Sequence, residues 1–123
     1  MKALLIDPTA QTIKEIDLKK GLQEKYKVME CSLIECPVEF DNGDLLFCDE
    51  EGKLKGENIK GGFSFIDDWY DIISGKCLIV GVDRNGDDAD CKSTPEYFMK
   101  QWKGFKWFTA DEVKRYVRRK YGI

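Results

Sequence analysis

The stretch KCLIVGVDRNGD, residues 76–87, decides the fold because an apolar strand runs directly into a turn signal. Over residues 76–83 the apolar side chains fall on both faces of a strand, which predicts a strand at the centre of a sheet. The pair Asn85-Gly86 is typical of a two-residue hairpin turn, so residues 87–91 are expected to return beside that strand.

A second Asn-Gly pair, Asn42-Gly43, separates residues 33–40 from residues 44–48. Pairing around this turn puts Phe40 opposite Leu45 and Val38 opposite Phe47, which predicts one apolar face. Further strands are expected at 2–6, 11–16, 63–66 and 105–108, where short apolar or aromatic runs lie between turn residues.

Helix starts are marked by capping residues. Thr94-Pro95 places a capping threonine before a proline at the first helical position. Thr109 and Glu112 form a capping box, which predicts a basic helix over about 110–121 that ends at Gly122.

A weaker helix is expected over residues 18–27, with Asp17 as its cap. The mixture of hairpins and helices predicts the α+β class: a mostly antiparallel sheet of hairpins with two or three short helices on one side. Because no repeat or linker interrupts the chain, residues 1–123 are expected to form a single domain.

The chain has no histidine, which removes the commonest general base and every metal site that needs an imidazole ligand. Five cysteines show no C-x-x-C spacing, and no phosphate-binding or nucleophile-elbow motif occurs. We therefore expect a protein that is not an enzyme, with no catalytic residue, no cofactor and no metal ligand.

The segment from Asp83 to Asp90 begins like a calcium loop, with Asp83, Asn85 and Asp87 at alternate positions. The pattern then fails, because Asp88 stands where the loop needs a glycine. A hairpin turn explains the same residues, and a weak cation site is the alternative.

The apolar runs are too short to span a bilayer, and no signal-peptide core follows the N-terminus. The expectation is a cytoplasmic protein of a bacterial host cell, without membrane contact and with its cysteines reduced.

Charge is distributed unevenly along the chain, whose formal net charge is −3. Residues 1–99 carry 12 Lys or Arg and 21 Asp or Glu, whereas residues 100–123 carry 8 and 2. The chain therefore combines an acidic body with a basic end that could contact phosphate or an acidic protein.

The basic end alternates cations with aromatic rings, as a platform for single-stranded nucleic acid would require. Core packing of the aromatics and a solvated helix face are the alternatives. The candidate residues for binding a partner or nucleic acid are Trp102, Lys103, Lys106, Trp107, Lys114, Arg115, Arg118 and Arg119.

An acidic surface is the second candidate, because regularly spaced carboxylates can imitate the phosphates of nucleic acid toward a DNA-binding protein. Solubility and turn chemistry explain the same residues without a partner. The expected acidic residues are Asp41, Asp44, Asp49, Glu50, Glu51, Asp67 and Asp68.

Several segments, laid in order, resemble a small uncharacterised family, a domain of unknown function found in phages, plasmids and other bacterial mobile elements. The most specific segments are the stretch from Cys48 to Gly56 and the stretch from Tyr70 to Asp83. The resemblance covers about residues 1–110 and supplies no catalytic residues. It leaves the basic helix outside the shared pattern.

This resemblance implies a context in which short accessory proteins often block host defences. The expected function is a non-enzymatic binding protein that antagonises a bacterial defence system, of the anti-restriction or anti-CRISPR type, by binding an effector protein or its ligand. The expected partner is a host protein. A nucleic-acid-binding accessory protein, a nucleotide ligand and self-association into a homo-oligomer are the alternatives.

Overall fold

The computed structural model describes residues 1–64, 71–101 and 105–122. Within these residues the chain forms a six-stranded and a three-stranded sheet, three α-helices and two short 3-10 helices. The strands are β1 Lys2–Asp7, β2 Thr12–Asp17, β3 Ile34–Glu39, β4 Leu45–Asp49, β5 Gly62–Ser64, β6 Ile73–Ser74, β7 Cys77–Val82, β8 Asp88–Ala89 and β9 Lys106–Phe108. The helices are α1 Leu22–Met29, α2 Pro95–Gln101 and α3 Ala110–Tyr121, with η1 Gly52–Leu54 and η2 Gly56–Asn58 as the 3-10 helices.

The large sheet confirms the central place of the apolar strand. Its order is β2-β1-β7-β4-β3, with β8 paired to β7, and every pairing is antiparallel. Asn85-Gly86 forms the turn between β7 and β8, where the amide of Gly86 donates to the Asp83 carbonyl and Asp83 in turn donates to Asp87. The predicted α+β class with a mostly antiparallel sheet is therefore confirmed.

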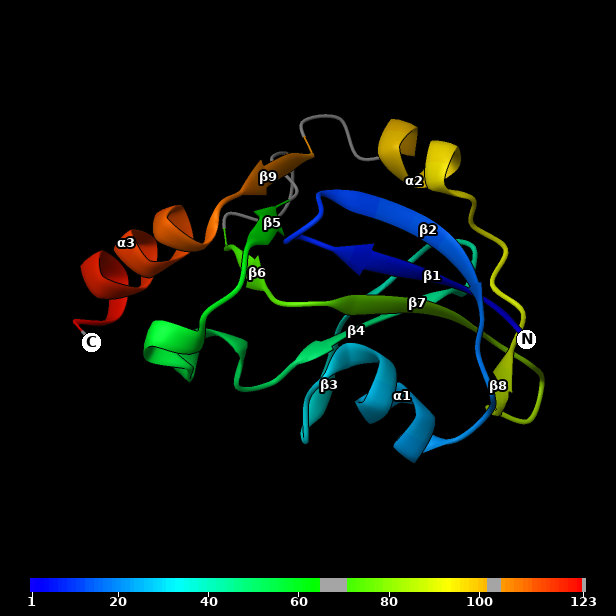
Figure 1. The fold of residues 1–123 in the computed structure, drawn as a ribbon. Helices are drawn as coiled ribbons and strands as arrows, with labels where there is room; N and C mark the ends of the chain where they lie inside the picture. The colour runs from blue at the N-terminus through cyan, green and yellow to red at the C-terminus, as the bar shows by residue number, and fades with distance from the viewer. Residues whose placement is uncertain (65–70, 102–104, 123) are drawn as a thin grey trace.

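Helices cover both faces of the large sheet, so the prediction of helices on one side was wrong (Figure 1). Met29 of α1 packs with Leu78 and Val80 on one face. Phe98 of α2 packs with Ile79 on the opposite face, as the alternation of side chains along β7 requires. A strand that is apolar on both faces needs a cover on each, and the two helices supply them.

The hairpin of β3 and β4 forms with a register different from the predicted one. Val38 lies opposite Leu46, and the register shifts between Glu35 and Val38. Phe40 and Val38 consequently share a core cluster with Leu46 and not with Phe47, which packs toward the other face. The cause lies at the turn, where the Phe40 amide donates to the Asp44 carbonyl and closes a loop of three residues, 41–43, in place of the two-residue loop expected from Asn42-Gly43. A shift of one residue in the pairing moves side chains to the opposite face.

The first helix begins later than predicted and has a different cap. Gly21 precedes α1 with φ 113°, a conformation that favours glycine, while Asp17 accepts from the N-terminal ammonium at 2.9 Å. Lys25 of α1 is buried, with 6% of its surface exposed, and its ammonium lies 2.5 Å from the Asp88 carboxylate.

The predicted cap of α2 at Thr94 is confirmed, because the Thr94 hydroxyl accepts a hydrogen bond from the Tyr97 amide.

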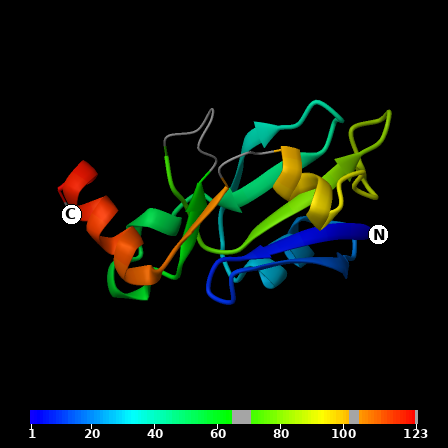
Figure 2. The same ribbon diagram turned by 90° about the horizontal axis from the view of Figure 1, so that it is seen from above.

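The small sheet, with order β6-β5-β9, and α3 form the end of the molecule farthest from the N-terminus (Figure 2). Phe63 of β5 joins this sheet to the core of the large one, where it packs with Ile79 and Phe98. The two termini consequently lie at opposite ends of an elongated molecule. Of the predicted strand at 63–66, residues 63 and 64 lie in β5, and residues 65 and 66 lie outside the described residues.

Candidate functional site

The basic helix α3 forms where its capping residues predict. The Thr109 hydroxyl accepts from the Glu112 amide at 3.2 Å, and the Glu112 carboxylate accepts from the Thr109 amide at 3.0 Å. The hydrogen bond from the Thr109 backbone lowers the pKa of Glu112, so the carboxylate stays ionised beside the positive end of the helix. Gly122, at φ 70°, closes the other end.

One face of α3 is fastened to the rest of the chain. Val113 and Val117 are buried against Ile59 and Ile72. This apolar contact fixes the rotation of the helix about its own axis, and so decides which of its side chains face outward.

Polar contacts reinforce this attachment at Asp71. The Tyr116 hydroxyl donates to the Asp71 carboxylate, and the ammonium groups of Lys53 and Lys120 lie 2.7 and 3.5 Å from that carboxylate. The hydrogen bond to Tyr116 raises the pKa of Lys120, which holds this lysine in its charged form. Lys120 is consequently engaged at the edge of the attachment.

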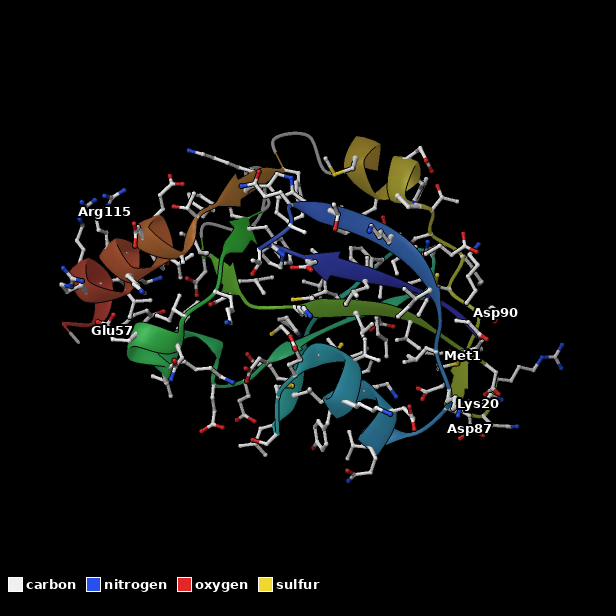
Figure 3. All side chains as sticks on the ribbon, viewed as in Figure 1. Met1, Lys20, Glu57, Asp87, Asp90 and Arg115 are labelled. Carbon is white, nitrogen blue, oxygen red and sulfur yellow. The ribbon has the colours of Figure 1, made fainter. Side chains whose placement is uncertain are left out.

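The outward face of α3 carries three exposed arginines, Arg115, Arg118 and Arg119. Within the described residues no carboxylate lies within ion-pair distance of these three side chains, whereas Lys114 lies 3.6 Å from Glu57. Figure 3 shows Arg115 on the side of α3 away from η2, and Glu57 on the side that faces it. We call Arg115, Arg118 and Arg119 the outward arginine face; they are the exposed cations of α3 without an ion pair among the described residues.

Trp107, an aromatic residue of the predicted binding platform, packs against other rings of the core. Trp107 is half-buried and its ring packs edge-on against Phe105 and Phe63, at centroid distances of 4.8 and 6.3 Å. Lys106 is exposed, with its ammonium 5.0 Å from the centroid of the Phe108 ring. Trp107 thus contributes to the core, which favours the core-packing interpretation for this ring.

The other two residues of that platform, Trp102 and Lys103, lie outside the described residues. Six of the eight predicted residues are therefore described: the half-buried Trp107 and five cations, which are Lys106, Lys114, Arg115, Arg118 and Arg119.

One residue of the predicted acidic surface is buried in the structure. Asp44 is buried, with 1% of its surface exposed, and accepts hydrogen bonds from the amides of Lys92 and Ser93 at 3.0 and 2.8 Å and from the Ser93 hydroxyl at 2.6 Å. Its assignment to the surface was wrong, because the two amides and the hydroxyl of a distant segment satisfy the carboxylate and allow it to be buried.

Other members of the predicted acidic surface differ from one another. Asp49 pairs with Lys55 at 2.8 Å and its side chain is 7% exposed. Asp41, Glu50 and Glu51 are exposed. Asp67 and Asp68 lie outside the described residues, so the structure describes three exposed carboxylates of the predicted seven.

The Asp83 segment forms a turn. The Asp83 carboxylate accepts from the amides of Asn85 and Asp87, at 2.8 and 3.0 Å, and so serves its own loop. Across residues 1–64, 71–101 and 105–122, no three His, Cys, Asp or Glu side chains gather as metal ligands would.

The five cysteines are unbridged. Burial raises the pKa of every one of these thiols, including that of Cys77, which has no exposed surface. A thiol with a raised pKa is a weak nucleophile at neutral pH, so the observed environments do not favour cysteine-based catalysis.

The sequence did not indicate the residues that face α3 from η1 and η2. Lys53, Leu54 and Glu57 are brought to the helix by the fold and line a cavity of about 270 Å³ beside it. Leu54 is 67% exposed. The nearest signal in the sequence was this single leucine between Lys53 and Lys55, and it does not reveal a neighbour sixty residues away.

Comparison with known proteins places most of this fold in one family. Residues 1–103 match the family described as a domain of unknown function (DUF3846), so β9 and α3 lie beyond the matched region. No curated protein and no solved structure matches the chain. No helix within the described residues is both long and apolar enough to cross a membrane.

Proposed function

We propose that this chain, which belongs to the DUF3846 family of domains of unknown function, is a non-enzymatic binding protein that contacts its partner through the outward arginine face. One observation carries the proposal. Arg115, Arg118 and Arg119 are exposed without an ion pair among the described residues, on a helix whose opposite face is fixed by Val113 and Val117. A rigid row of unpaired guanidinium groups is suited to carboxylates or phosphates, which each guanidinium can bind through two parallel hydrogen bonds.

The favoured partner is the acidic surface of a protein. Sequence-tolerant binding of single strands needs aromatic faces on which bases stack. Among the described residues of the basic end, the ring of Trp107 packs instead against Phe63 and Phe105, and the ring of Tyr121 lies 5.9 and 5.6 Å from the ammonium groups of Lys53 and Lys120. We therefore propose electrostatic attraction as the main means of contact. A protein surface that is rich in carboxylates requires only the guanidinium groups.

The biological setting is part of the proposal. We place the chain in the cytoplasm of a bacterial host, as a phage or mobile-element protein that blocks a defence effector. The support is the resemblance of residues 48–56 and 70–83 to sequences from such elements, together with the separation of charge between residues 1–99 and 100–123. An inhibitor that acts by occupying a surface needs no catalytic group.

The test compares two variants that each lose three cations. The site variant is Arg115→Ala, Arg118→Ala and Arg119→Ala. The control variant is Lys14→Ala, Lys19→Ala and Lys20→Ala, three exposed lysines remote from α3, where Figure 3 labels Lys20 near the N-terminus. Alanine keeps the helix propensity of α3, and both variants have the same net charge.

Affinity capture from host lysate, followed by titration of the purified partner, measures the effect. We expect the site variant to lose at least about tenfold in affinity, which corresponds to about 1.4 kcal/mol, and the control variant to bind like the wild type. In cells, wild-type protein should protect a phage from restriction or CRISPR interference, and the site variant should not. Equal binding by both variants, or a gel shift of single strands that exceeds protein binding, would contradict the proposal.

A further inference from the structure

A cavity lies between α3 and the segment formed by η1 and η2, next to the outward arginine face. Its volume is about 270 Å³. Leu54, Ile59 and Val117 supply its apolar lining, and of these Ile59 and Val117 are buried whereas Leu54 is 67% exposed. The cavity therefore has an apolar base with an exposed leucine at its edge.

The charges around this cavity are predominantly positive. Lys53, Lys114 and Arg118 line it together with one carboxylate, that of Glu57. Lys53 is paired with Asp71 at 2.7 Å, so the excess positive charge at the cavity comes from Arg118. Glu57 lies 3.6 Å from Lys114 and its side chain is 96% exposed, so this ion pair is weak and easily exchanged for another carboxylate. Arg118 has no carboxylate within ion-pair distance among the described residues.

The volume of the cavity limits its occupant. Pockets that enclose a whole small molecule commonly hold about 300 to 1,000 Å³, and this one is smaller. A single large side chain fits this size, and the apolar base favours an aliphatic or aromatic one. A buried apolar anchor inside a polar rim is also how the energetic centre of a protein interface is usually built.

Another cavity, of about 440 Å³, makes a useful contrast. Lys55, Lys60 and Lys76 line it with as many carboxylates, those of Asp7, Glu30 and Asp49. Lys55 is paired with Asp49 and Lys76 with Glu30, at 2.8 and 2.7 Å. This balance of charge selects no ligand, whereas the cavity beside α3 favours an anionic one.

We infer that the cavity beside α3 receives one large apolar side chain from an acidic segment of the partner protein. Carboxylates on either side of that anchor bind Arg118 and Lys114, and the anchor packs on Leu54, Ile59 and Val117. This inference rests on the proposed function, because the same helix presents the arginine face, and it adds the chemistry of the sequence that the partner must offer.

The experiment uses two blocked peptides as probes, one with a central leucine flanked by glutamates and one with serine in place of that leucine. Fluorescence anisotropy measures their affinities for the full chain. The leucine peptide is expected to bind about tenfold more tightly than the serine peptide, the equivalent of about 1.4 kcal/mol. The methyl resonances of Leu54 and Val117 should shift only with the leucine peptide.

Substitutions in the protein distinguish the contribution of the apolar anchor to binding from that of the charged groups. Leu54→Ser should remove the preference for leucine and leave the affinity for the serine peptide unchanged. Leu22→Ser is the matched control, because Leu22 is also half exposed, at 50%, but lies in α1. Arg118→Ala should weaken both peptides.

Each remaining outcome is decisive. Equal affinity for the two peptides overturns the anchor, and if the loss of Arg115 and Arg119 still weakens both peptides, the proposed function stands. Failure of both peptides to bind overturns the anchor, and the titration of the purified partner then decides the proposed function separately. Binding of single-stranded oligonucleotides in preference to the peptides overturns both.

Discussion

Asp44 shows how one carboxylate can hold two distant parts of the chain together. It follows the Asn42-Gly43 turn and accepts from the amides of Lys92 and Ser93, in the segment that leads to α2. The Ser93 hydroxyl donates to the same carboxylate and accepts from the Asn42 amide group. The turn thereby anchors the segment on which α2 depends.

Replacing Asp44 with asparagine is therefore expected to lower the free energy of unfolding by about 2 kcal/mol. The amide has one acceptor oxygen where the carboxylate has two, and its NH₂ group would face donors. Urea unfolding followed by circular dichroism measures the loss. Asp41→Asn, on the exposed side of the same turn, should change the free energy by less than about 0.5 kcal/mol. Equal effects of the two substitutions would show that the hydrogen bonds of Asp44 do not stabilise the fold.

Lys25 is a buried cation that, like the Asp44 carboxylate, links two distant parts of the chain. Its ammonium lies 2.5 Å from Asp88 and 5.4 Å from the centroid of the Phe47 ring, and the Gly21 amide donates to the same carboxylate. The pair links α1 to β8, two elements that are more than sixty residues apart in sequence. A cation in this position depends on its partner, because water does not replace the lost carboxylate.

We expect Asp88→Ala to cost about 3 kcal/mol of unfolding free energy, because it leaves Lys25 buried without its carboxylate. Lys25→Met combined with Asp88→Ala should cost less than Asp88→Ala alone, since an apolar side chain of similar length has no charge to satisfy. A double-mutant cycle measured by urea unfolding gives the coupling energy. Strictly additive effects of the two substitutions would contradict the role assigned to this pair.

At the scale of elements, the attachment of α3 depends on Asp71. Burial raises the pKa of this carboxyl, but hydrogen bonds from Lys53 and Tyr116 outweigh burial and leave the pKa below its ordinary value. A carboxyl whose pKa is lower in the folded chain favours folding at pH values above the unfolded pKa, near about 3.9. That contribution is lost as the pH falls from there through the lower pKa of the folded state.

The comparison of wild type with Asp71→Asn tests this linkage. The difference in unfolding free energy is expected to be constant above about pH 5 and to shrink as the pH falls below about 4. Tyr116→Phe should show a smaller pH dependence than wild type, because one of the hydrogen bonds that lower the pKa is gone. Urea titrations at a series of pH values provide the measurement. A difference that is independent of pH would mean that Asp71 titrates alike in the folded and unfolded chain.

The contrast between α3 and the hairpin of β3 and β4 explains what the sequence predicts well. The capping box at Thr109 and Glu112 is a local interaction, so three residues of spacing suffice to place the start of α3. The register of the hairpin depends on the length of its loop, which is three residues because Phe40 pairs with Asp44, and a further shift follows between Glu35 and Val38. The pair Asn42-Gly43 does not distinguish a loop of two residues from one of three. Local hydrogen bonds are therefore readable from the sequence, and irregular pairing is not.

The residues of the candidate site also differ in whether local or long-range contacts determine their position. Arg115, Arg118 and Arg119 were among the candidate binding residues, and helix periodicity alone places them on one polar face of α3. Asp44 was misplaced because its partners Lys92 and Ser93 are nearly fifty residues away. Leu54 was overlooked because only the tertiary fold brings it to Val117. Long-range contacts decide which of many similar charged residues remain exposed.

At the scale of the whole molecule, Phe63 couples the two sheets. It has no exposed surface, lies in β5 of the small sheet, and packs with Leu4 and Ile79 of the large sheet. Its ring stacks on Phe105 at a centroid distance of 5.4 Å and meets Trp107 edge-on. One continuous cluster of the described residues therefore spans both sheets, while a second cluster of Ile59, Ile72, Val113 and Val117 attaches α3 beside the small sheet. The shared cluster couples the small sheet to the large one.

The whole chain is consequently expected to unfold in one cooperative transition, as a single domain does. Tryptophan fluorescence and far-UV circular dichroism should give the same urea midpoint. Phe63→Leu should lower both midpoints together, by an amount that corresponds to more than about 1 kcal/mol, because the smaller side chain leaves a void in the shared cluster. Lys106→Ala, at an exposed position of β9, is the control and should leave both midpoints unchanged. If the fluorescence midpoint moved while the dichroism midpoint did not, the small sheet with α3 would be an independent unit. The outward arginine face would then lie on a unit that unfolds separately from the residues matched to the family. That result would contradict the proposal, because binding through α3 requires the helix to be held in a fixed position.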